Sequence, residues 1–191
     1  MNPGESEDFD RARASFETSD YKEALRIYES LAARGSASAQ DFVGWMYLEG
    51  LGTPQDKQEA RRRFLEAAKH DDPWGQYHLG YLAIGEGNHE EAKNWFNRAA
   101  SAGHVQALYR LGLMYESGRG VPADDHKAAE YLQAAADRGH LLARRDITLR
   151  LLRREHNLWR KSIWILALVR IFFDGLRIAW KNPDDKRLGK H

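Results

Sequence analysis

The chain has 191 residues, of which 42% are hydrophobic, enough to bury the core of one or two domains. Its 29 Lys and Arg residues nearly balance 28 Asp and Glu residues, so net charge alone favours no charged partner. Cysteine is absent, which excludes disulfides, thiolate nucleophiles and cysteine-bound metals.

The N-terminal part of the chain is acidic and polar. Residues 1–7 therefore predict a disordered N-terminus. The stretch MNPGESEDFD lacks the basic segment and the apolar run of a secretory signal peptide, so we expect a cytoplasmic protein. Residues 141–191 contain 13 basic and 5 acidic residues, whereas residues 1–140 contain 16 basic and 23 acidic residues. A net-acidic body is thus followed by a net-basic C-terminal region.

Residues 8–139 contain an internal repeat, which we divide into copies at about 8–35, 36–71, 72–103 and 104–139. Three copies share a glycine, an alanine 16, 12 and 16 residues later, and a Phe or Leu four residues after that alanine. The first copy contains only the second half of this pattern, around Ala24. The shared positions are Gly44, Gly80 and Gly112, then Ala60, Ala92 and Ala128, then Phe64, Phe96 and Leu132.

Each copy predicts two helices, because apolar residues recur at spacings of three and four. A residue able to cap a helix stands four residues before each key alanine: Asp20, Asp56, Asn88 and Asp124. Glu23, Glu59 and Glu91 follow three residues later and complete a capping-box pattern in three copies. A glycine opposite an alanine, with Gly112 facing Ala128, would let two helices approach closely. One copy cannot bury its apolar face alone, so the copies must stack.

The copies "LGLMYESGRGVPADDHKAAEYLQAAADRGH" and "GWMYLEGLGTPQDKQEARRRFLEAA" resemble the Sel1-like repeat family, a branch of the tetratricopeptide-like superfamily. The other two copies depart toward the ordinary tetratricopeptide form. The resemblance covers about residues 8–155 and implies an all-α solenoid of stacked helix-turn-helix repeats. It also implies an adaptor or scaffold that holds a protein or peptide partner on its concave face, and the repeat has no characteristic catalytic residues.

The sequence indicates no catalytic, cofactor-binding or metal site. The segments GLGTPQ and GRGVPA lack the third glycine of a dinucleotide site and the Lys-Ser/Thr of a phosphate loop, so we interpret them as turns that end helices. The eight histidines form no H-E-x-x-H motif. Acidic residues near His70, His78 and His126 are interpreted as solvated loop residues. We therefore expect a protein that is not an enzyme and needs no cofactor.

Helical geometry predicts which side chains of the first helices face the concave groove: those two residues before and one residue after each shared glycine. Aromatic, His and Arg side chains at these positions suit partner binding. We expect His78 and Arg110 to face solvent. An alternative for Trp45, Tyr81 and Leu113 is packing between neighbouring first helices. The six candidates are Phe42, Trp45, His78, Tyr81, Arg110 and Leu113.

Residues 140–155 predict a capping helix, a lone first helix with Thr148 in place of the glycine. The arginines of segment 144–160 make nucleic-acid binding an alternative function. Leucines interleave with these arginines, and no recognised nucleic-acid module is present, so nucleic acid is an unlikely partner by this reading.

Residues 158–181 predict an amphipathic helix of about 24 residues and about 36 Å. Arg170, Asp174 and Arg177 lie on one side of it. The ten Ile, Leu, Val and Phe residues between 163 and 178 favour a bilayer by roughly 3–6 kcal/mol, whereas Arg170 and Asp174 cost roughly 5–7 kcal/mol. Lying on a membrane is thus favoured over spanning it, although pairing of Asp174 with a neighbouring arginine keeps a tail anchor open.

The aromatic residues of this helix suit a membrane interface, and the surrounding basic residues attract anionic lipids. The same helix has two alternative roles: capping the solenoid, or pairing with a second copy in a homodimer. Residues 182–191 predict a basic polar tail. The membrane or packing aromatics are Trp159, Trp164, Phe172, Phe173 and Trp180.

Overall fold

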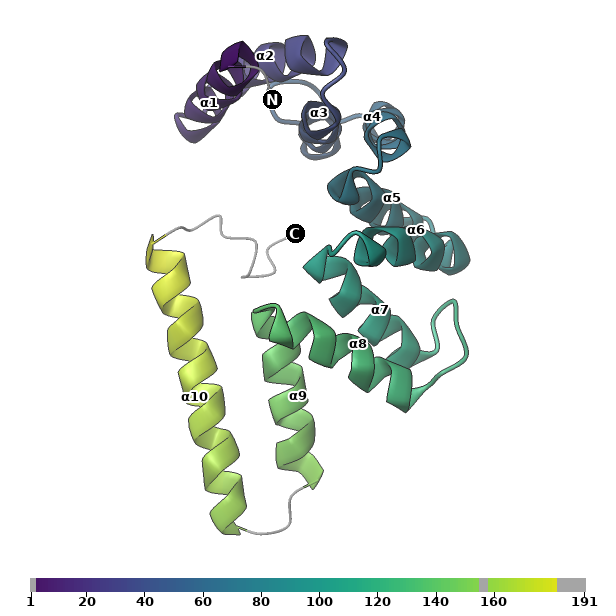
Figure 1. Cartoon of the computed structure of the whole chain (residues 1–191), viewed down its shortest axis with the longest axis vertical. Coiled ribbons are helices and arrows are strands. Elements are labelled where there is room, and N and C mark those ends of the chain that lie inside the picture. Colours follow the sequence, from purple (N-terminus) through teal and green to yellow (C-terminus); the bar gives the residue numbers. More distant parts are fainter. Residues whose placement is uncertain (1–2, 155–157, 182–191) are drawn as a thin grey trace. The chain divides into compact units, whose positions relative to one another are not determined.

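The computed structural model describes residues 3–154 and 158–181, which form ten α-helices and contain no strand (Figure 1). The chain divides into two compact units, residues 1–104 and residues 105–191. The predicted all-α class is confirmed.

The first unit contains six helices, and each of the first five packs against the next helix along the chain. The first helices of neighbouring repeats also touch, as α3 and α5 do, and this contact stacks one repeat on the next. The six helices are α1 (Pro3–Glu17), α2 (Tyr21–Ala33), α3 (Ala37–Glu49), α4 (Lys57–Lys69), α5 (Pro73–Gly85) and α6 (His89–Ser101).

The start of α1 corrects the predicted disordered N-terminus, because residues 3–7 are helical; residues 1 and 2 lie outside the described residues. The helix is tied down directly after this segment. Arg34 donates to Oδ2 of Asp8 over 2.6 Å, and Phe9 is buried with its ring 5.9 Å from that of Tyr28. Composition shows that residues 1–7 are polar, but not that the next turn is anchored.

The predicted N-caps are confirmed. The side chain of Asp56 accepts from the backbone N–H groups of Gln58 and Glu59 over 2.9 and 3.0 Å. Such bonds satisfy amides that have no partner within the first turn of the helix. The second helices of the four repeats are capped in this way by Asp20, Asp56, Asn88 and Asp124.

The reciprocal half of the capping box is wrong. The backbone N–H of each capping residue donates to the preceding helix or its end instead, as Asp56 does to the carbonyl of Tyr47 over 2.9 Å. The glutamate is thereby left for arginines, and Arg63 Nε donates to Glu59 Oε1 over 2.7 Å. A backbone carbonyl of the preceding helix thus replaces the glutamate as the acceptor for the N–H of the capping residue.

The nearest contact of the shared glycines is the residue four positions after the alanine, which the predicted pairing of Gly112 with Ala128 did not include; at Gly44 the carbonyl of Ala60 also lies 3.1 Å from the position of a Cβ atom. A Cβ atom on Gly112 would lie 2.8 Å from Cγ of Leu132, and one on Gly80 would lie 2.6 Å from the ring of Phe96. Leu132 and Phe96 have no exposed surface. The glycine therefore makes room for a buried large side chain to lie against the backbone of the first helix.

The two G-x-G segments are turns that end helices, as predicted. Gly50 caps α3 in the left-handed conformation, with φ of 72°, and Gly52 follows with φ of 74°. Gly118 and Gly120 have φ values of 70° and 73° in the equivalent loop. These conformations favour glycine because it has no Cβ atom.

The second unit contains α7 (Val105–Ser117), α8 (Asp125–Asp137), α9 (Leu141–Arg154) and α10 (Leu158–Lys181). Helices α7 and α8 form the fourth repeat, and α9 packs against α8. Helix α10 packs against α9 and runs beside it in Figure 1. It therefore takes the place that a second helix has in the regular repeats.

Candidate partner-binding surfaces

Two predicted groove residues of the first unit, Phe42 and Trp45, are half-buried and pack on its core. The ring of Phe42 stacks on Tyr28 with centroids 4.8 Å apart, and the ring of Trp45 lies 5.5 Å from that of Phe16. Trp45 also touches the core of the next repeat. Packing between neighbouring first helices thus describes Trp45, whereas Phe42 packs on the second helix α2.

His78 is buried, with 6% of its surface exposed, which corrects the prediction that it faces solvent. Its Nδ1 lies 2.7 Å from Oδ1 of Asp41, which is 7% exposed, and its ring stacks on Phe64 with centroids 4.7 Å apart. A polar group tolerates burial when a partner satisfies it. The available signal was Asp41, an acid at the position that Tyr77 and Tyr109 occupy in later repeats.

Tyr81 is the most exposed of the predicted groove residues in the first unit, at 37%. In the second unit, Arg110 and Leu113 are both half-buried. Arg110 therefore faces solvent only in part. Of the six candidates, Tyr81 offers the largest exposed fraction to a partner.

A partly buried polar cluster beside Arg110 was not predicted. Tyr109 donates to Oδ2 of Asp146 over 2.8 Å and stacks on His140 with centroids 4.4 Å apart. Burial, together with the bond to Asp146, raises the pKa of Tyr109 to about 12. Burial lowers the pKa of His140 to about 4, and its Nδ1 accepts from the backbone N–H of Ala143 over 3.2 Å. Neutral His140 thus caps α9, and this cluster is structural.

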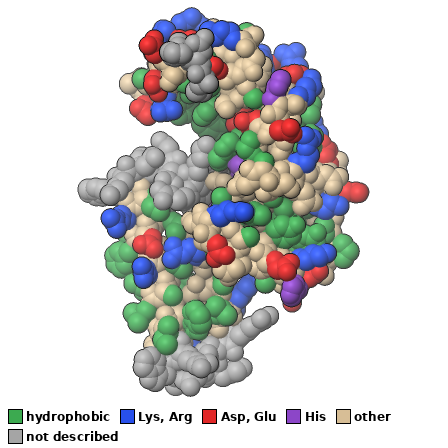
Figure 2. All heavy atoms as spheres, in the orientation of Figure 1, with side chains coloured by type: hydrophobic (Ala, Val, Ile, Leu, Met, Phe, Trp, Pro, Cys, Tyr) green, Lys and Arg blue, Asp and Glu red, His purple; other side chains and the backbone are tan. Residues whose placement is uncertain are grey.

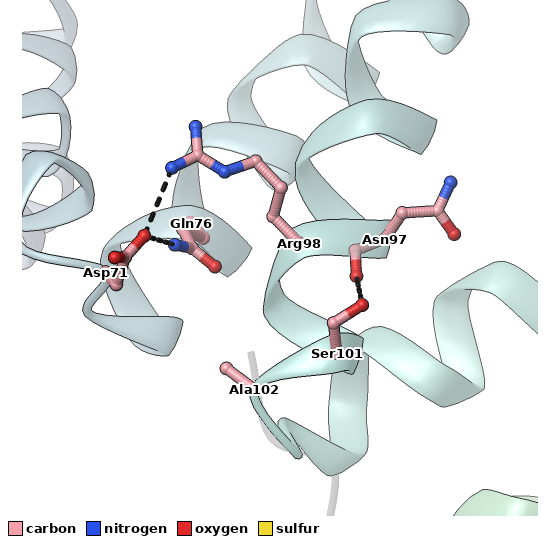
Figure 3. A pocket seen from close by; sticks show the side chains of 6 residues that line it. All are labelled: Asp71, Gln76, Asn97, Arg98, Ser101 and Ala102. Atoms are coloured by element: carbon pink, nitrogen blue, oxygen red, sulfur yellow. Dashed lines mark hydrogen bonds and ion pairs between the residues drawn. The ribbon is translucent and has the colours of Figure 1, made fainter.

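A shallow pocket of about 450 Å³ lies where the α4–α5 loop and α5 meet the C-terminal end of α6 (Figure 3). Gln76, which is 2% exposed, donates through Nε2 to Oδ1 of Asp71 over 3.5 Å. The guanidinium of Arg98 lies 3.4 Å from the same oxygen. The pocket is lined by Asp71, Gln76, Asn97, Arg98, Ser101 and Ala102.

Helix α10 has one side that packs against α9. On that side, Ile171 is 9% exposed and Gly175 lies against Leu141. Asp174 pairs with Arg144 of α9 over 3.6 Å, whereas we considered only Arg170 or Arg177 as its partner. The spacing of residues within one helix cannot reveal a contact with another helix.

A second side of α10 carries large apolar side chains with 45–68% of their surface exposed, which we name the apolar stripe. At about 100° per residue these side chains span about 120° of the helix. Arg170 and Arg177 are exposed beside them, and Figure 2 shows hydrophobic and basic side chains at the surface in the region of α10. The apolar stripe comprises Ile165, Leu166, Val169, Phe172, Phe173 and Leu176.

The remaining predicted aromatics of this helix are only partly described. Trp164 is half-buried, and the side chains of Trp159 and Trp180 lie outside the described residues. Among the described residues, no helix combines the length and apolar character needed to cross a bilayer. The same residues contain no group of three or more side chains suited to hold a metal ion.

The repeats now described match a family model of the Sel1 repeat at residues 16–36, 37–72, 75–104 and 105–140. The chain belongs to the Sel1 repeat family. The first match covers α2 and the other three cover the helix pairs α3–α4, α5–α6 and α7–α8, so nearly all of α1 and the whole of α9 and α10 lie outside this Sel1 region. Proteins with Sel1 repeats mediate protein–protein interactions and are typically non-catalytic scaffolds.

Similar proteins agree with this Sel1 assignment. Chitin synthase regulatory factor 4 of Schizosaccharomyces pombe is 37% identical over 92 residues, which are 48% of this chain and 14% of the relative. A Sel1 repeat protein from Oxalobacter formigenes has a TM-score of 0.66 and 26% identity, covering 74% of this chain and 58% of that chain. A protective antigen of uropathogenic Escherichia coli displaying an SLR fold has a TM-score of 0.65 and 28% identity, covering 78% and 34%.

Proposed function

We propose that this chain is a non-catalytic scaffold that captures a protein or peptide partner on the concave face of its helical repeats. The observation that carries this proposal is the run of four Sel1 repeats over residues 16–140. The yeast relative is named a regulatory factor, which fits a role in assembling other proteins. Two polar pairs, the buried Asp41–His78 pair and the partly buried Tyr109–Asp146 pair, are engaged in packing rather than arranged for chemistry.

The exposed fractions of the candidate side chains indicate which of them a partner can contact. Tyr81 is the most accessible aromatic among the candidates, and Arg110 and Leu113 are half-exposed in the second unit. Tyrosine and arginine are enriched among residues that dominate binding energy. His78 holds α5, the helix that presents Tyr81, against α3, and Phe42 packs α3 on α2.

Site-specific photo-crosslinking in native lysate tests the concave site. A photoreactive phenylalanine replaces Tyr81, and a matched chain carries it at Asn94, an exposed position on the second helix of the same repeat. We expect a protein adduct from position 81 that is absent from position 94. Equal adducts from both positions, or none from position 81, would contradict the concave site.

We propose further that α10 tethers this scaffold to an anionic membrane surface. The apolar stripe is exposed, and Arg170 and Arg177 lie beside it, which is the distribution of a helix that lies in a membrane interface. Basic residues near an anionic surface contribute about 1 kcal/mol each. Because Asp174 pairs with Arg144 of α9, its negative charge is partly offset.

Vesicle co-sedimentation tests the tether with the full chain. We expect binding to phosphatidylserine–phosphatidylcholine vesicles and weaker binding to phosphatidylcholine alone. Phe172→Ser with Phe173→Ser should abolish it, whereas Leu65→Ser, at an exposed leucine of α4, should not. If the double variant changes the oligomeric state but not vesicle binding, the apolar stripe is a homodimer contact instead.

The alternative of nucleic-acid binding is not favoured by the contacts of the arginine-rich segment. Arg144 pairs with Asp174, Arg145 with Asp146 and Arg150 with Glu116. These acids offset charge that a phosphate backbone would need to meet.

A further inference from the structure

We propose that the pocket between the α4–α5 loop and α6 binds the main chain of an extended peptide segment, through Gln76 and Arg98. In this assignment Oε1 of Gln76 accepts from a peptide N–H, and the guanidinium of Arg98 donates to a peptide carbonyl. The pocket is separate from the predicted groove residues, so the proposal does not rest on the concave site.

The first step of the argument is an unsatisfied acceptor. Gln76 is 2% exposed, and its Oε1 has no hydrogen-bond partner within the described part of the chain. The contact of Nε2 with Asp71 Oδ1 orients the amide, and in Figure 3 Oε1 points into the space beside the C-terminal end of α6. A buried oxygen without a donor is unfavourable, so a ligand that supplies an N–H gains from binding there.

The preceding repeat provides an internal comparison. Gln40 lies four residues before Gly44, just as Gln76 lies four residues before Gly80. The amide of Gln40 is used on both sides: Nε2 donates to the carbonyl of Ala32 over 3.0 Å, and Oε1 accepts from Nη1 of Arg63 over 3.3 Å. In the preceding repeat, the glutamine at this position therefore has both its donor and its acceptor satisfied.

Two sequence changes leave Gln76 without these partners. Trp95 replaces the arginine that Arg63 provides in the preceding repeat, so no guanidinium from that position reaches Oε1. Arg98 replaces Glu66 of the preceding repeat, and its Nη2 lies 3.5 Å from the carbonyl of Ala68, which is equivalent to that of Ala32. The pocket thus arises from a specific departure from the repeat rather than from loose packing.

The guanidinium of Arg98 is held in place, but some of its N–H donors have no partner among the described residues. Its guanidinium lies 4.9 Å over the ring of Trp95, whose Nε1 donates to Glu91 over 3.2 Å. Its contacts with Asp71 and Ala68, at 3.4 and 3.5 Å, are long and both use Nη2. Stacking thus fixes a planar donor group whose Nε and Nη1 make no hydrogen bond within the described residues.

The chemistry of the lining selects an amide rather than an anion. Asp71 lies beside Arg98 and offsets its charge, so a free carboxylate or phosphate would meet an opposing carboxylate. A peptide group presents an N–H and a C=O together, which matches the acceptor of Gln76 and the donor of Arg98. The hollow of about 450 Å³ is shallow and open to solvent, so it would hold a short segment of main chain against the surface without enclosing it.

Nuclear magnetic resonance titration of the full chain tests the proposal with defined probes. The probe is N-acetyl-trialanine N-methylamide, and its fully N-methylated analogue keeps the carbonyls but has no N–H donor. We expect millimolar binding that shifts the side-chain amide of Gln76 and the Nε–H of Arg98. The N-methylated analogue should bind about fivefold more weakly or not at all, because it cannot donate to Oε1.

Three variants complete the test. Gln76→Leu and Arg98→Ala should each weaken binding about fivefold or more. Gln40→Leu, at the matched position whose amide is already satisfied, should leave it unchanged. Because Arg98 is half-exposed, its variant keeps the test valid if Gln76→Leu does not fold.

Four outcomes would overturn the peptide site: no shift with the probe, equal binding of the N-methylated analogue, tighter binding of acetate than of the peptide, or binding that persists in Arg98→Ala. A crystal structure with only an ordered water on Gln76 Oε1 in the presence of the probe would do the same. None of these outcomes bears on crosslinking at position 81, so the two proposals fail separately.

Discussion

The regular repeats and the α9–α10 pair differ in what they do with apolar surface. The second helices α2, α4, α6 and α8 each have 13 residues, and large side chains such as Phe64, Phe96 and Leu132 are fully buried on them. Helix α10 has 24 residues and leaves Leu166, Phe172 and Phe173 more than 60% exposed. Large apolar side chains of the second helices are buried within the repeats, whereas those of α10, where the repeat pattern ends, are exposed.

The difference begins within α9, after its first turns. Helix α9 still starts as a repeat does, because His140 stacks on Tyr109 with centroids 4.4 Å apart, just as His104 stacks on Tyr77 at 4.6 Å. Thr148 then replaces the shared glycine, and its hydroxyl donates to the carbonyl of Arg144 within the same helix. A side chain at that position removes the notch into which a large residue of a second helix would fit.

The largest expected effect tests the glycine notch. Gly112→Leu should lower the free energy of unfolding by more than about 3 kcal/mol, because even a Cβ atom there would lie 2.8 Å from buried Leu132. Chemical denaturation measures the change. Gly85→Ala is the control, since a Cβ atom at Gly85 meets nothing within 4 Å. A small loss for Gly112→Leu would mean that the repeats tolerate a side chain where α9 has Thr148.

The second prediction concerns pH at the boundary between the regions. His140 is neutral when folded and has a pKa of about 4, below the ordinary 6.5, so its contribution is complete above pH 6.5 and is lost as pH falls toward 4. The loss should reach up to about 3 kcal/mol. His140→Asn keeps an acceptor for Ala143 N–H but does not titrate. The free energy of unfolding of the variant, relative to that of the wild type, should therefore rise as pH falls from 6.5 to 4. Parallel pH profiles of the two proteins would contradict the assignment.

The sequence was informative about local structure and less so about contacts between helices. Asp56 and Gly50 were correctly predicted as a cap and a helix-ending turn, because each acts within a few residues of its own position. Gly112 was paired with Ala128, and its nearest contact, Leu132, was missed, since spacing along one helix does not reveal where two helices cross.

Buried polar contacts were the least predictable part of the candidate sites. His78 was expected in solvent because its partner, Asp41, lies 37 residues away on another first helix. Gln76 was not among the predicted site residues. Comparison of Gln40 with Gln76, and of Arg63 with Trp95, would have indicated that one amide had lost its donor, but only once the function of Gln40 was known.

A third prediction sharpens the contrast in glycine use. Gly175→Ala in α10 should raise the free energy of unfolding by about 0.5–1 kcal/mol, because alanine favours a helix over glycine. The added Cβ atom would make an ordinary contact of 3.7 Å with Leu141. Thermal denaturation measures the gain. A loss comparable to that of Gly112→Leu would show that α10 packs on α9 as tightly as a regular repeat does.

The smallest expected effect concerns the apolar stripe. Phe173 is 61% exposed, so Phe173→Ser should change the free energy of unfolding by less than about 0.5 kcal/mol. Ile171→Ala, two residues away on the side packed against α9, should lower it by roughly 2 kcal/mol. Denaturation at two protein concentrations separates folding from association. If Phe173→Ser is as costly as Ile171→Ala and the cost depends on concentration, a second copy already covers the stripe in solution, and the stripe is not free for a membrane.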